Sequence, residues 1–575
     1  IKKCQKYKVY FIFLLEYYKV YFIKNLTYYK IYFIIYIKEG YEMAIFNEEQ
    51  VLKILNAYNP WWKNSQIPSD YLREMKRTAY YEAERIIMNE YVRRFIILSG
   101  ARRVGKTTIL YQLIQKLIQQ EVDEKNIIYL SLDNPILKFG TLDKIMEIYI
   151  NNIATVGPVY IFLDEIQYAS DWNNWLKVFY DQNKNWNIVA TGSASPLINK
   201  GITESGVGRW ITITVPTLSF YEYCKLVDDK QELDPRYLIN GIKSLPEDTR
   251  EMLNQTDISD KKKSEIIKEI FNNILEEQRN IEKINREIPE DFSVKNIENM
   301  KQEEFAKIIN ILEPMKKYFN RYLTIGGFPE LALSKDDKMA QRILREDIVD
   351  KVLKRDMPEL FGIRNISVLE KVFLYLCFES SNIINYSSMS QDLDGVTSPT
   401  IQDYVKYLEN ANLIYISEQL NVTGAKLLKG RPKIYIADSA LRNAVLMKED
   451  ILTDATEMGY IVETAVYRHL YTFIQNTTGN IGYYRDIKTG KEIDVVTNSV
   501  KENMYVEVKY REDSTVKNDN PIYQKDGKND KLFIITKNIN DYSIKELENG
   551  KKVVRIPAFA YLYLLGLEEM RNIEK

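Results

Sequence analysis

The sequence is poor in the side chains on which many metal sites depend. Its 575 residues include three cysteines, Cys4, Cys224 and Cys377, and one histidine, His469. Cysteines this few and this far apart exclude a disulfide scaffold and a cysteine-based zinc site, and they are typical of a cytoplasmic protein. The single histidine excludes a histidine-based metal cluster, and we expect it at the surface. Any metal must therefore be held by carboxylates, which suits Mg²⁺ or Mn²⁺.

The sequence also has almost no net charge and no long apolar run. A formal charge of −1 gives no overall electrostatic case for a nucleic-acid partner. Residues 1–42 are mostly Ile, Tyr, Phe and Lys in a repeat of 11 residues, but Glu16, Lys19, Lys24 and Lys30 interrupt every stretch that could span a membrane. No signal-peptide cleavage site is evident. We expect no membrane partner, and we interpret this leader as translated AT-rich repeat DNA, with the native start at Met43.

A phosphate-binding loop follows the first clear strand. Residues 95–99 lead into Gly100-x4-Gly105-Lys106-Thr107, and a helical pattern then runs to about Gln119. Glycines at both ends permit the positive φ and close approach that backbone N–H groups need to converge on a triphosphate. Lys106 is predicted to reach the β- and γ-phosphates and Thr107 to ligate Mg²⁺, with the helix N-terminus aimed at the anion. The residues expected to bind ATP are Gly100, Ala101, Arg102, Arg103, Val104, Gly105, Lys106, Thr107 and Thr108.

Three further segments are candidates for the chemistry of hydrolysis. An apolar strand ends in Asp164 and Glu165, which are predicted to hold Mg²⁺ through water and to polarise the attacking water. A third strand ends near Ser193, the preferred γ-phosphate sensor, with Thr191 as the alternative. Arg209 follows a glycine-rich turn, where an arginine finger and a solvated loop arginine are both open interpretations.

These motifs together resemble the archaeal and bacterial AAA-family ATPases, with the AAA_14 type of P-loop domain, that carry a C-terminal nuclease-like domain of the DUF4143 kind. The segments that carry the resemblance are 100–107, 163–167, 191–195, 208–209, 217–223 and 326–330. The similarity runs from about Met43 to the C-terminus and implies ATP hydrolysis of the AAA+ type. Ala101 departs from the pattern, because relatives often have proline there, and this change should not impair phosphate binding.

The strand and helix patterns predict an α/β fold with several domains. Strands at 95–99, 127–132, 159–163, 187–191 and 210–215 alternate with helical patterns, as in the parallel sheet of a P-loop NTPase. The charged stretch 225–317 is expected to form a lid-like insertion with solvated polar faces, or to bind a partner. The expected domains are a low-complexity leader (1–42), N-terminal helices (43–92), the ATPase core (93–224), a helical insertion and lid (225–364), a winged helix (365–448) and a nuclease-like α/β domain (449–575).

The fifth of these domains has the order of a winged helix-turn-helix. Helical patterns at 368–378, 386–393 and 398–412 precede strand-like segments at 413–419 and 432–437. The third helix is predicted to enter a major groove, with Lys426, Lys429 and Arg431 along the phosphates. Asp403 and Glu409 on that helix leave a second interpretation open, in which the domain binds only other proteins.

Four charged side chains in the last domain have a spacing that suits metal-dependent phosphodiester chemistry. Glu463 lies in a helix, Asp494 at the start of a strand, and Glu507 and Lys509 two residues apart on the next strand. Strand positions two apart share a face, so Glu507 and Lys509 point the same way. Carboxylates from adjacent strands and one from a helix can bind Mg²⁺, so Asp494 and Glu507 are predicted to bind it near Glu463, and Lys509 to act on the water and the transition-state charge. The set resembles the PD-(D/E)xK nuclease core. The alternative is a strand whose alternating charges face solvent.

The sequence thus predicts a cytoplasmic, Mg²⁺-dependent ATP hydrolase that works on DNA through its winged helix and nuclease-like domain. The predicted catalytic residues are Lys106, Glu165, Ser193, Arg209, Glu463, Asp494, Glu507 and Lys509. The alternative is a regulatory ATPase switch whose C-terminal domains only bind partners.

Overall fold

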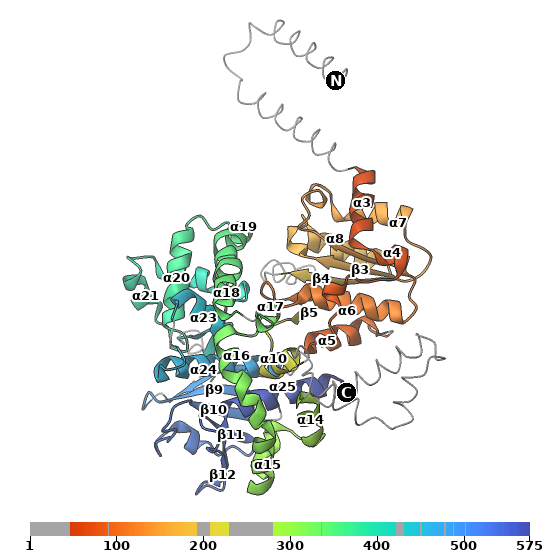
Figure 1. Ribbon diagram of the computed structural model, residues 1–575. Coiled ribbons are helices and arrows are strands. Elements are labelled where there is room, and N and C mark those ends of the chain that lie inside the picture. The colour runs from red at the N-terminus through yellow and green to blue at the C-terminus, as the bar shows by residue number, and fades with distance from the viewer. Residues whose placement is uncertain are drawn as a thin grey trace, which may run out of the picture. The chain divides into compact units, whose positions relative to one another are not determined.

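The computed structural model describes most of the chain from residue 47 onward (Figure 1). The described residues are 47–89, 91–192, 208–228, 280–334, 336–420, 431–448, 451–475, 479–486, 488–500 and 502–574. They fall into two compact units. The first holds the described residues up to Gln66 and Glu121–Ile188, and the second holds Ile67–Gln120 and the described residues from Val189 on. The leader 1–42, Ser193, Lys426 and Lys429 lie outside the described residues, so the predictions made for them stay predictions.

The first unit is built on a parallel strand pair covered by helices. Its elements are α3 (Glu48–Tyr58), α4 (Trp61–Asn64), β2 (Ile127–Ser131), α7 (Leu142–Asn152), β3 (Val159–Asp164) and α8 (Trp172–Gln182). The turn between α3 and α4 is fixed to β2 by side chains. The Asn59 amide donates to the Tyr129 carbonyl (2.9 Å) and accepts from the Tyr129 N–H (2.6 Å), and Trp61 donates to the Ile127 carbonyl (3.0 Å).

The five-stranded sheet that contains these two strands has the order β2-β3-β4-β1-β5. Its other strands are β1 (Phe95–Ser99), β4 (Trp186–Gly192) and β5 (Trp210–Thr214), and β1 pairs with both neighbours in parallel. All five strands lie within one residue of the predicted ranges, and the predicted α/β class is confirmed. In the second unit, α5 (Thr78–Ile87) packs against β1 and β5, and α6 (Lys106–Gln119) follows β1 in the chain. The interior of β1 is fully apolar because a central parallel strand is buried on both faces.

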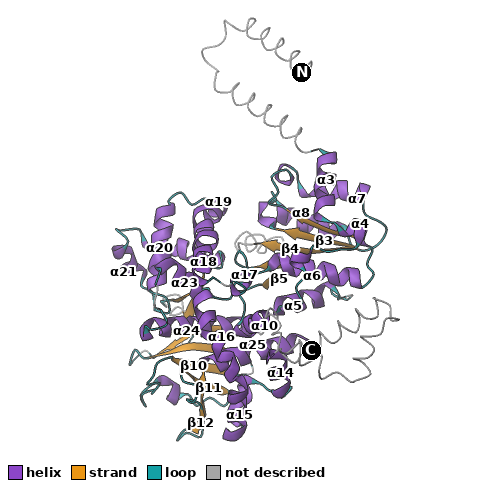
Figure 2. Ribbon diagram, in the orientation of Figure 1, coloured by secondary structure: helices purple, strands orange, loops and turns teal. Residues whose placement is uncertain are grey.

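The C-terminal part of the second unit is an eight-stranded sheet with the order β12-β13-β11-β10-β9-β8-β6-β7. The strands that follow α24 (Ala455–Gln475) are β8 (Asn480–Arg485), β9 (Glu492–Asn498), β10 (Asn503–Lys509), β11 (Asp530–Thr536), β12 (Ser543–Glu546) and β13 (Lys552–Pro557). Helices α24 and α25 (Ala558–Glu574) lie on one face of this sheet (Figure 2). Their apolar side chains share one core with those of its strands. A smaller cluster that includes Val516 and Ile522 covers the other face.

The predicted helix–helix–helix–strand–strand order is present before that sheet. The elements are α20 (Ile366–Phe378), α21 (Tyr386–Asp392), α22 (Ser398–Asn410), β6 (Ile414–Gln419) and β7 (Lys433–Ile436). The two strands do not form a separate wing, because β6 also pairs in parallel with β8, with Glu418 opposite Gly482. All four residues of β7 are buried. The hairpin strands therefore belong to the C-terminal sheet.

The described part of the 225–317 stretch differs from the predicted lid. Its elements are α10 (Phe220–Asp228), α14 (Asn280–Glu287), η6 (Val294–Asn299) and α15 (Gln302–Leu312). Apolar residues of all four share one core with α24 and α25. Glu568 of α25 accepts from the Val294 N–H (2.7 Å), and Lys531 of β11 pairs with Glu298 (2.6 Å). Burial of apolar faces thus joins this segment to the C-terminal domain, which a reading of its charged residues did not predict.

A glycine pair lets two segments of the second unit meet. Gly326 ends α16 (Lys316–Ile325) with φ 80°. The Gly327 carbonyl accepts from the Leu218 N–H (2.6 Å), and the Gly327 N–H donates to the Asp438 carboxylate (3.0 Å). A Cβ on Gly327 would lie 2.5 Å from the Leu218 carbonyl oxygen. Only glycine permits this approach, which explains the Gly-Gly of the 326–330 motif.

Candidate functional site

The predicted phosphate-binding loop has the expected strand–loop–helix geometry. It leaves β1 at Ser99, and Gly105 has φ 97° immediately before α6 begins at Lys106. A Cβ on Gly100 would lie 2.1 Å from the Val215 carbonyl oxygen, so the neighbouring chain after β5 requires glycine there. The first N–H groups of α6 have no partner within the helix, and they form a local positive end that suits a phosphate.

The Lys106 side chain is turned into this loop. Its ammonium donates to the carbonyl oxygens of Gly100 (2.8 Å) and Ala101 (2.9 Å), and the residue is 6% exposed. Thr107 and Thr108 follow in the first turn of α6. The loop therefore holds a buried positive charge beside a helix N-terminus, which is the electrostatic environment that a triphosphate needs.

The two arginines of the loop are paired with acids from a segment that sequence reasoning did not connect to it. This segment contains α17 (Pro329–Ala332) and two π-helical stretches, η8 (Leu344–Asp350) and η9 (Val352–Asp356). Arg102 makes a bidentate pair with Asp356, with one N–H···O distance of 2.9 Å. Arg103 contacts Glu330 and, at 2.5 Å, Asp347. Direct contact of these arginines with phosphate stays a prediction.

A buried ion pair between Arg77 and Glu222 is hydrogen-bonded to the phosphate-binding loop. Arg77 donates to the Val104 carbonyl of the loop (2.8 Å), to the Thr217 carbonyl (3.3 Å) and to Glu222 of α10 (3.0 Å). The side chains of Arg77 and Glu222 are 6% and 3% exposed. Glu222 was noticed only as a member of the 217–223 motif, and Arg77 was missed, because nothing in its local sequence separates it from a surface arginine.

The expectation that His469 lies at the surface is wrong. The residue is 2% exposed on α24, its Nε2 accepts from the Phe220 N–H (2.9 Å), and its Nδ1 lies 2.6 Å from the Ala465 carbonyl. Burial lowers the pKa of His469, and the charge of Arg468 lowers it further. The ring is therefore neutral at pH 7, with Nδ1 protonated, and it joins α24 to the start of α10.

In the first unit, Asp164 ends β3 as predicted. It is 5% exposed and accepts from the Tyr129 hydroxyl (3.0 Å). Glu165 follows in the left-handed region with φ 55° and accepts from the Gln167 amide. A non-glycine residue in that region is uncommon, and such strain tends to occur at functional sites. The roles of both carboxylates, and those of Thr191 and Arg209 in the second unit, stay predictions.

The structure brings together the four charged residues predicted in the C-terminal domain. Glu463 projects from α24, Asp494 lies on β9, and Glu507 and Lys509 lie on β10, which pairs with β9 in antiparallel fashion. Lys509 donates to Glu507 Oε1 (2.5 Å), and Asp494 Oδ2 accepts from the Val508 N–H (2.8 Å). Glu507 is 3% exposed, so the alternative of a solvent-facing strand is excluded at this position.

A fifth charged residue of this cluster was missed. Lys433 of β7 places its ammonium 2.6 Å from Glu463 Oε1 and 3.6 Å from Asp494 Oδ1, and its side chain is 3% exposed. Tyr435, on the same face of β7, donates to Glu463 Oε1 (2.9 Å). The available signal was a lysine in an otherwise apolar strand, because a lysine that is fully buried requires an acidic partner.

The pKa values of the cluster reflect burial and close like charges. Burial raises the pKa of Glu463 and of Glu507, and the neighbouring Asp494 raises both further, against the opposing effects of Lys433 and Lys509. Glu507 Oε2 is buried without a hydrogen-bond partner in the part of the chain that the structure describes. Within that same part, no group of three or more His, Cys, Asp or Glu side chains is arranged to hold a metal ion.

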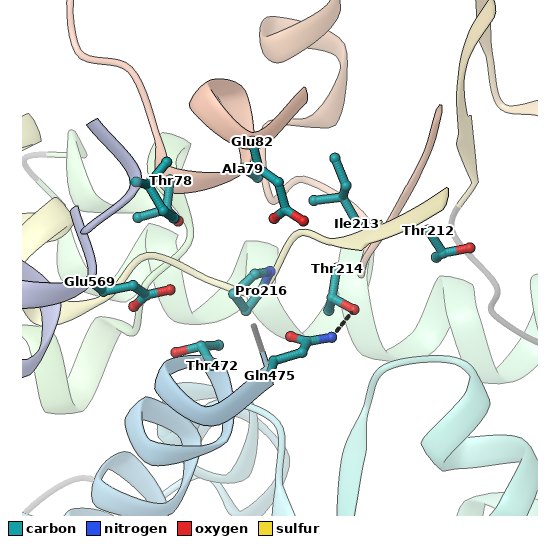
Figure 3. A pocket seen from close by; sticks show the side chains of 11 residues that line it. Thr78, Ala79, Glu82, Thr212, Ile213, Thr214, Pro216, Thr472, Gln475 and Glu569 are labelled. Atoms are coloured by element: carbon teal, nitrogen blue, oxygen red, sulfur yellow. Dashed lines mark hydrogen bonds between the residues drawn. The ribbon is translucent and has the colours of Figure 1, made fainter. Parts of the chain in front are cut away.

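A separate pocket of about 160 Å³ lies between α5, β5, α24 and α25 (Figure 3). Glu82 and Glu569 line it together with several hydroxyl groups, and Gln475 donates to Thr214 Oγ1 (2.5 Å). Burial raises the pKa of Glu569 to about 8 and raises that of Glu82 as well. A pocket whose ionisable residues are all acids does not suit a triphosphate.

None of the described helices is long and apolar enough to cross a lipid bilayer.

Three parts of the sequence match known domain families. Residues 92–224 match the AAA domain family (AAA_14), residues 458–559 match a domain of unknown function named DUF4143, and residues 316–452 match another named DUF8612. The last match crosses the predicted boundary at 364/365. An uncharacterised protein of Haemophilus influenzae is 24% identical over 76% of this chain and 88% of its own length. An uncharacterised protein of Methanocaldococcus jannaschii, MJ1637, is 24% identical over 79% and 84%.

Similarity to solved structures is weak. The Aeropyrum pernix Orc1 protein in complex with DNA superposes with a TM-score of 0.25 and 10% identity, covering 68% of this chain and 96% of that one. AMPPCP-bound DnaA from Aquifex aeolicus superposes with a TM-score of 0.22 and 17% identity, covering 53% and 96%. The family matches therefore identify the domains: residues 92–224 form a P-loop domain of the AAA type, and residues 458–559 form a DUF4143 domain.

Proposed function

We propose that this chain is a Mg²⁺-dependent ATP hydrolase. The observation that carries the proposal is the loop from Gly100 to Lys106, in which a buried ammonium lies beside the N-terminus of α6. Thr107 and Asp164 would help to hold Mg²⁺. When bound, this ion would neutralise negative charge on the phosphates. Glu165 would orient and polarise the attacking water. In this proposal Arg209 and Ser193 act on the γ-phosphate during hydrolysis.

Replacing Glu165 with glutamine tests this assignment. ATP binding should be unchanged, whereas kcat should fall by roughly 100-fold or more, because general-base assistance contributes about 10² to 10⁴ in rate. Phosphate release and calorimetric titration with ATP measure the two quantities. Glu147→Gln, an exposed position on α7, is the matched control and should change neither. Equal hydrolysis rates in Glu165→Gln and the unchanged protein would refute the role.

We further propose that the partner of the hydrolase is DNA, bound through α22. The order α20-α21-α22-β6-β7 supports this, since the third helix of such a unit reads the major groove. On α22 the side chains of Gln402, Asp403 and Lys406 are exposed, as is that of Arg431 before β7.

A fluorescence anisotropy titration with labelled duplex DNA tests this partner. Binding should weaken steeply as salt rises, because it releases counterions, and Lys406→Glu should weaken it several-fold at low salt. Lys307→Glu, an exposed change of the same charge on α15, should leave the affinity unchanged. Absence of binding at low salt would refute DNA as the partner.

The second candidate is a regulatory ATPase switch whose C-terminal domains bind only proteins. One observation favours it: the strands of the would-be wing are built into the C-terminal sheet, where β6 pairs with β8 and β7 is buried. Strands held in this way do not form the separate wing that would lie along DNA phosphates. In this case ATP hydrolysis would persist while the anisotropy titration with duplex DNA stayed flat.

A further inference from the structure

The PD-(D/E)xK core, which the C-terminal domain resembles, works with a divalent cation held by its carboxylates. Here the side chain of Lys433, from outside that core, lies between the carboxylates of Glu463 and Asp494. Lys433 reaches Glu463 Oε1 at 2.6 Å and Asp494 Oδ1 at 3.6 Å, and its residue is 3% exposed. The Tyr435 hydroxyl donates to Glu463 Oε1 (2.9 Å) and to the Asp494 carbonyl (3.3 Å).

Two further carboxylate oxygens of the cluster are already hydrogen-bonded. Asp494 Oδ2 already accepts from the Val508 N–H (2.8 Å), and Glu507 Oε1 accepts from both Lys509 (2.5 Å) and Asn520 (3.1 Å). Glu507 Oε2 is the one carboxylate oxygen of the cluster that is buried without a partner among the described residues. Mg²⁺ and Mn²⁺ are commonly held by one or two carboxylates, with water as the remaining ligands, but each of these three carboxylates already lies against a lysine ammonium.

The charge balance leads to the same conclusion. The carboxylates of Glu463, Asp494 and Glu507 are matched by the ammonium groups of Lys433 and Lys509, all in one largely buried cluster. A divalent cation placed between Glu463 and Asp494 would have to displace the Lys433 ammonium or lie against its positive charge. The residues present therefore do not fit the metal that the nuclease resemblance implies.

We propose that Lys433 is an internal counter-cation, whose ammonium occupies the place between Glu463 and Asp494 and excludes a divalent metal from it. The ion pair holds β7 in the C-terminal sheet. In this state the domain does not cleave phosphodiesters, and the prediction that Asp494 and Glu507 bind Mg²⁺ fails. This proposal depends neither on ATP hydrolysis nor on DNA binding, so its test is separate from theirs.

The test is calorimetric titration of the nucleotide-free full chain with Mn²⁺, combined with thermal unfolding. Mn²⁺ binding by the unchanged protein should be the same as that by the Glu463→Gln variant, because the cluster holds no Mn²⁺ in either. Lys433→Met leaves Glu463 and Asp494 without their cation, so it should lower the thermal midpoint, and Mn²⁺ should restore it. Its Mn²⁺ affinity should exceed that of the unchanged protein at least tenfold, and Lys433→Met/Glu463→Gln should lose this gain.

Lys531→Met is the matched control. It removes a partly buried lysine from the same sheet, where Lys531 pairs with Glu298, and Mn²⁺ should not restore its stability. Submillimolar Mn²⁺ binding by the unchanged protein that Glu463→Gln removes would overturn the proposal. So would a Lys433→Met protein that gains no Mn²⁺ affinity, or one that stays unfolded with excess Mn²⁺.

Discussion

Replacing Lys106 with alanine is expected to weaken ATP binding by roughly 100-fold, which corresponds to about 3 kcal/mol. The ammonium is the buried positive charge of the loop, held 2.8 Å from the Gly100 carbonyl and 2.9 Å from the Ala101 carbonyl. Without it, the β- and γ-phosphates would lose their charge-assisted hydrogen bond. Calorimetric titration with a non-hydrolysable ATP analogue measures the loss.

Lys116→Ala is the control for this variant. It removes a lysine from the same helix, α6, where Lys116 pairs with Glu84 at the surface (3.2 Å), so it changes the charge of the protein by the same amount. Its ATP affinity should stay within a factor of two, because a surface pair contributes about 0–1 kcal/mol. An affinity for the analogue that is the same in Lys106→Ala as in the unchanged protein would refute the assignment of the loop as the nucleotide site.

Glu222→Gln is expected to lower the free energy of unfolding by about 3–5 kcal/mol, the usual effect of removing one partner from a buried ion pair. The change leaves the Arg77 guanidinium, which is 6% exposed by side chain, with only the carbonyls of Val104 and Thr217 and no opposite charge. Calorimetric unfolding measures the loss. Because Arg77 donates to Val104 within the phosphate-binding loop, a weaker ATP affinity should accompany the loss of stability.

Lowering the pH should reproduce part of this effect. Burial alone would raise the pKa of Glu222, but the charge and hydrogen bonds of Arg77 and the Ser219 N–H outweigh it and lower the pKa below the ordinary value of 4.5. A carboxyl group with a lowered pKa stabilises the fold fully above its unfolded value, and this contribution disappears as the pH falls through the folded value. The contribution should be absent from Glu222→Gln. Glu287→Gln, an exposed change on α14, should match the unchanged protein at every pH.

The sequence by itself determined the local elements and the nucleotide loop. The strands of a parallel sheet appear in the sequence as continuous apolar runs, and glycine at position 105 answers a local need, the positive φ before α6. The need for glycine at position 100 comes instead from Val215, which is distant in the sequence. The helices and strands from α20 to β7 could also be predicted, since each depends on periodicity, caps and turns within a few residues. Even the strand placement of Asp494, Glu507 and Lys509 follows from the period of two.

Only the tertiary structure decided what these residues contact. Arg77 and Glu222 are 145 positions apart, and Arg102 and Asp356 are 254 apart, so no local pattern relates them. His469 belongs to a helix whose whole middle is buried, which its mixed sequence does not indicate. The burial of Lys433 was likewise decided by the tertiary structure. Its local sequence shows a lysine near a basic hairpin, but the pairing of β6 with β8 carries it into the sheet, where burial requires a negative partner and Glu463 and Asp494 supply one.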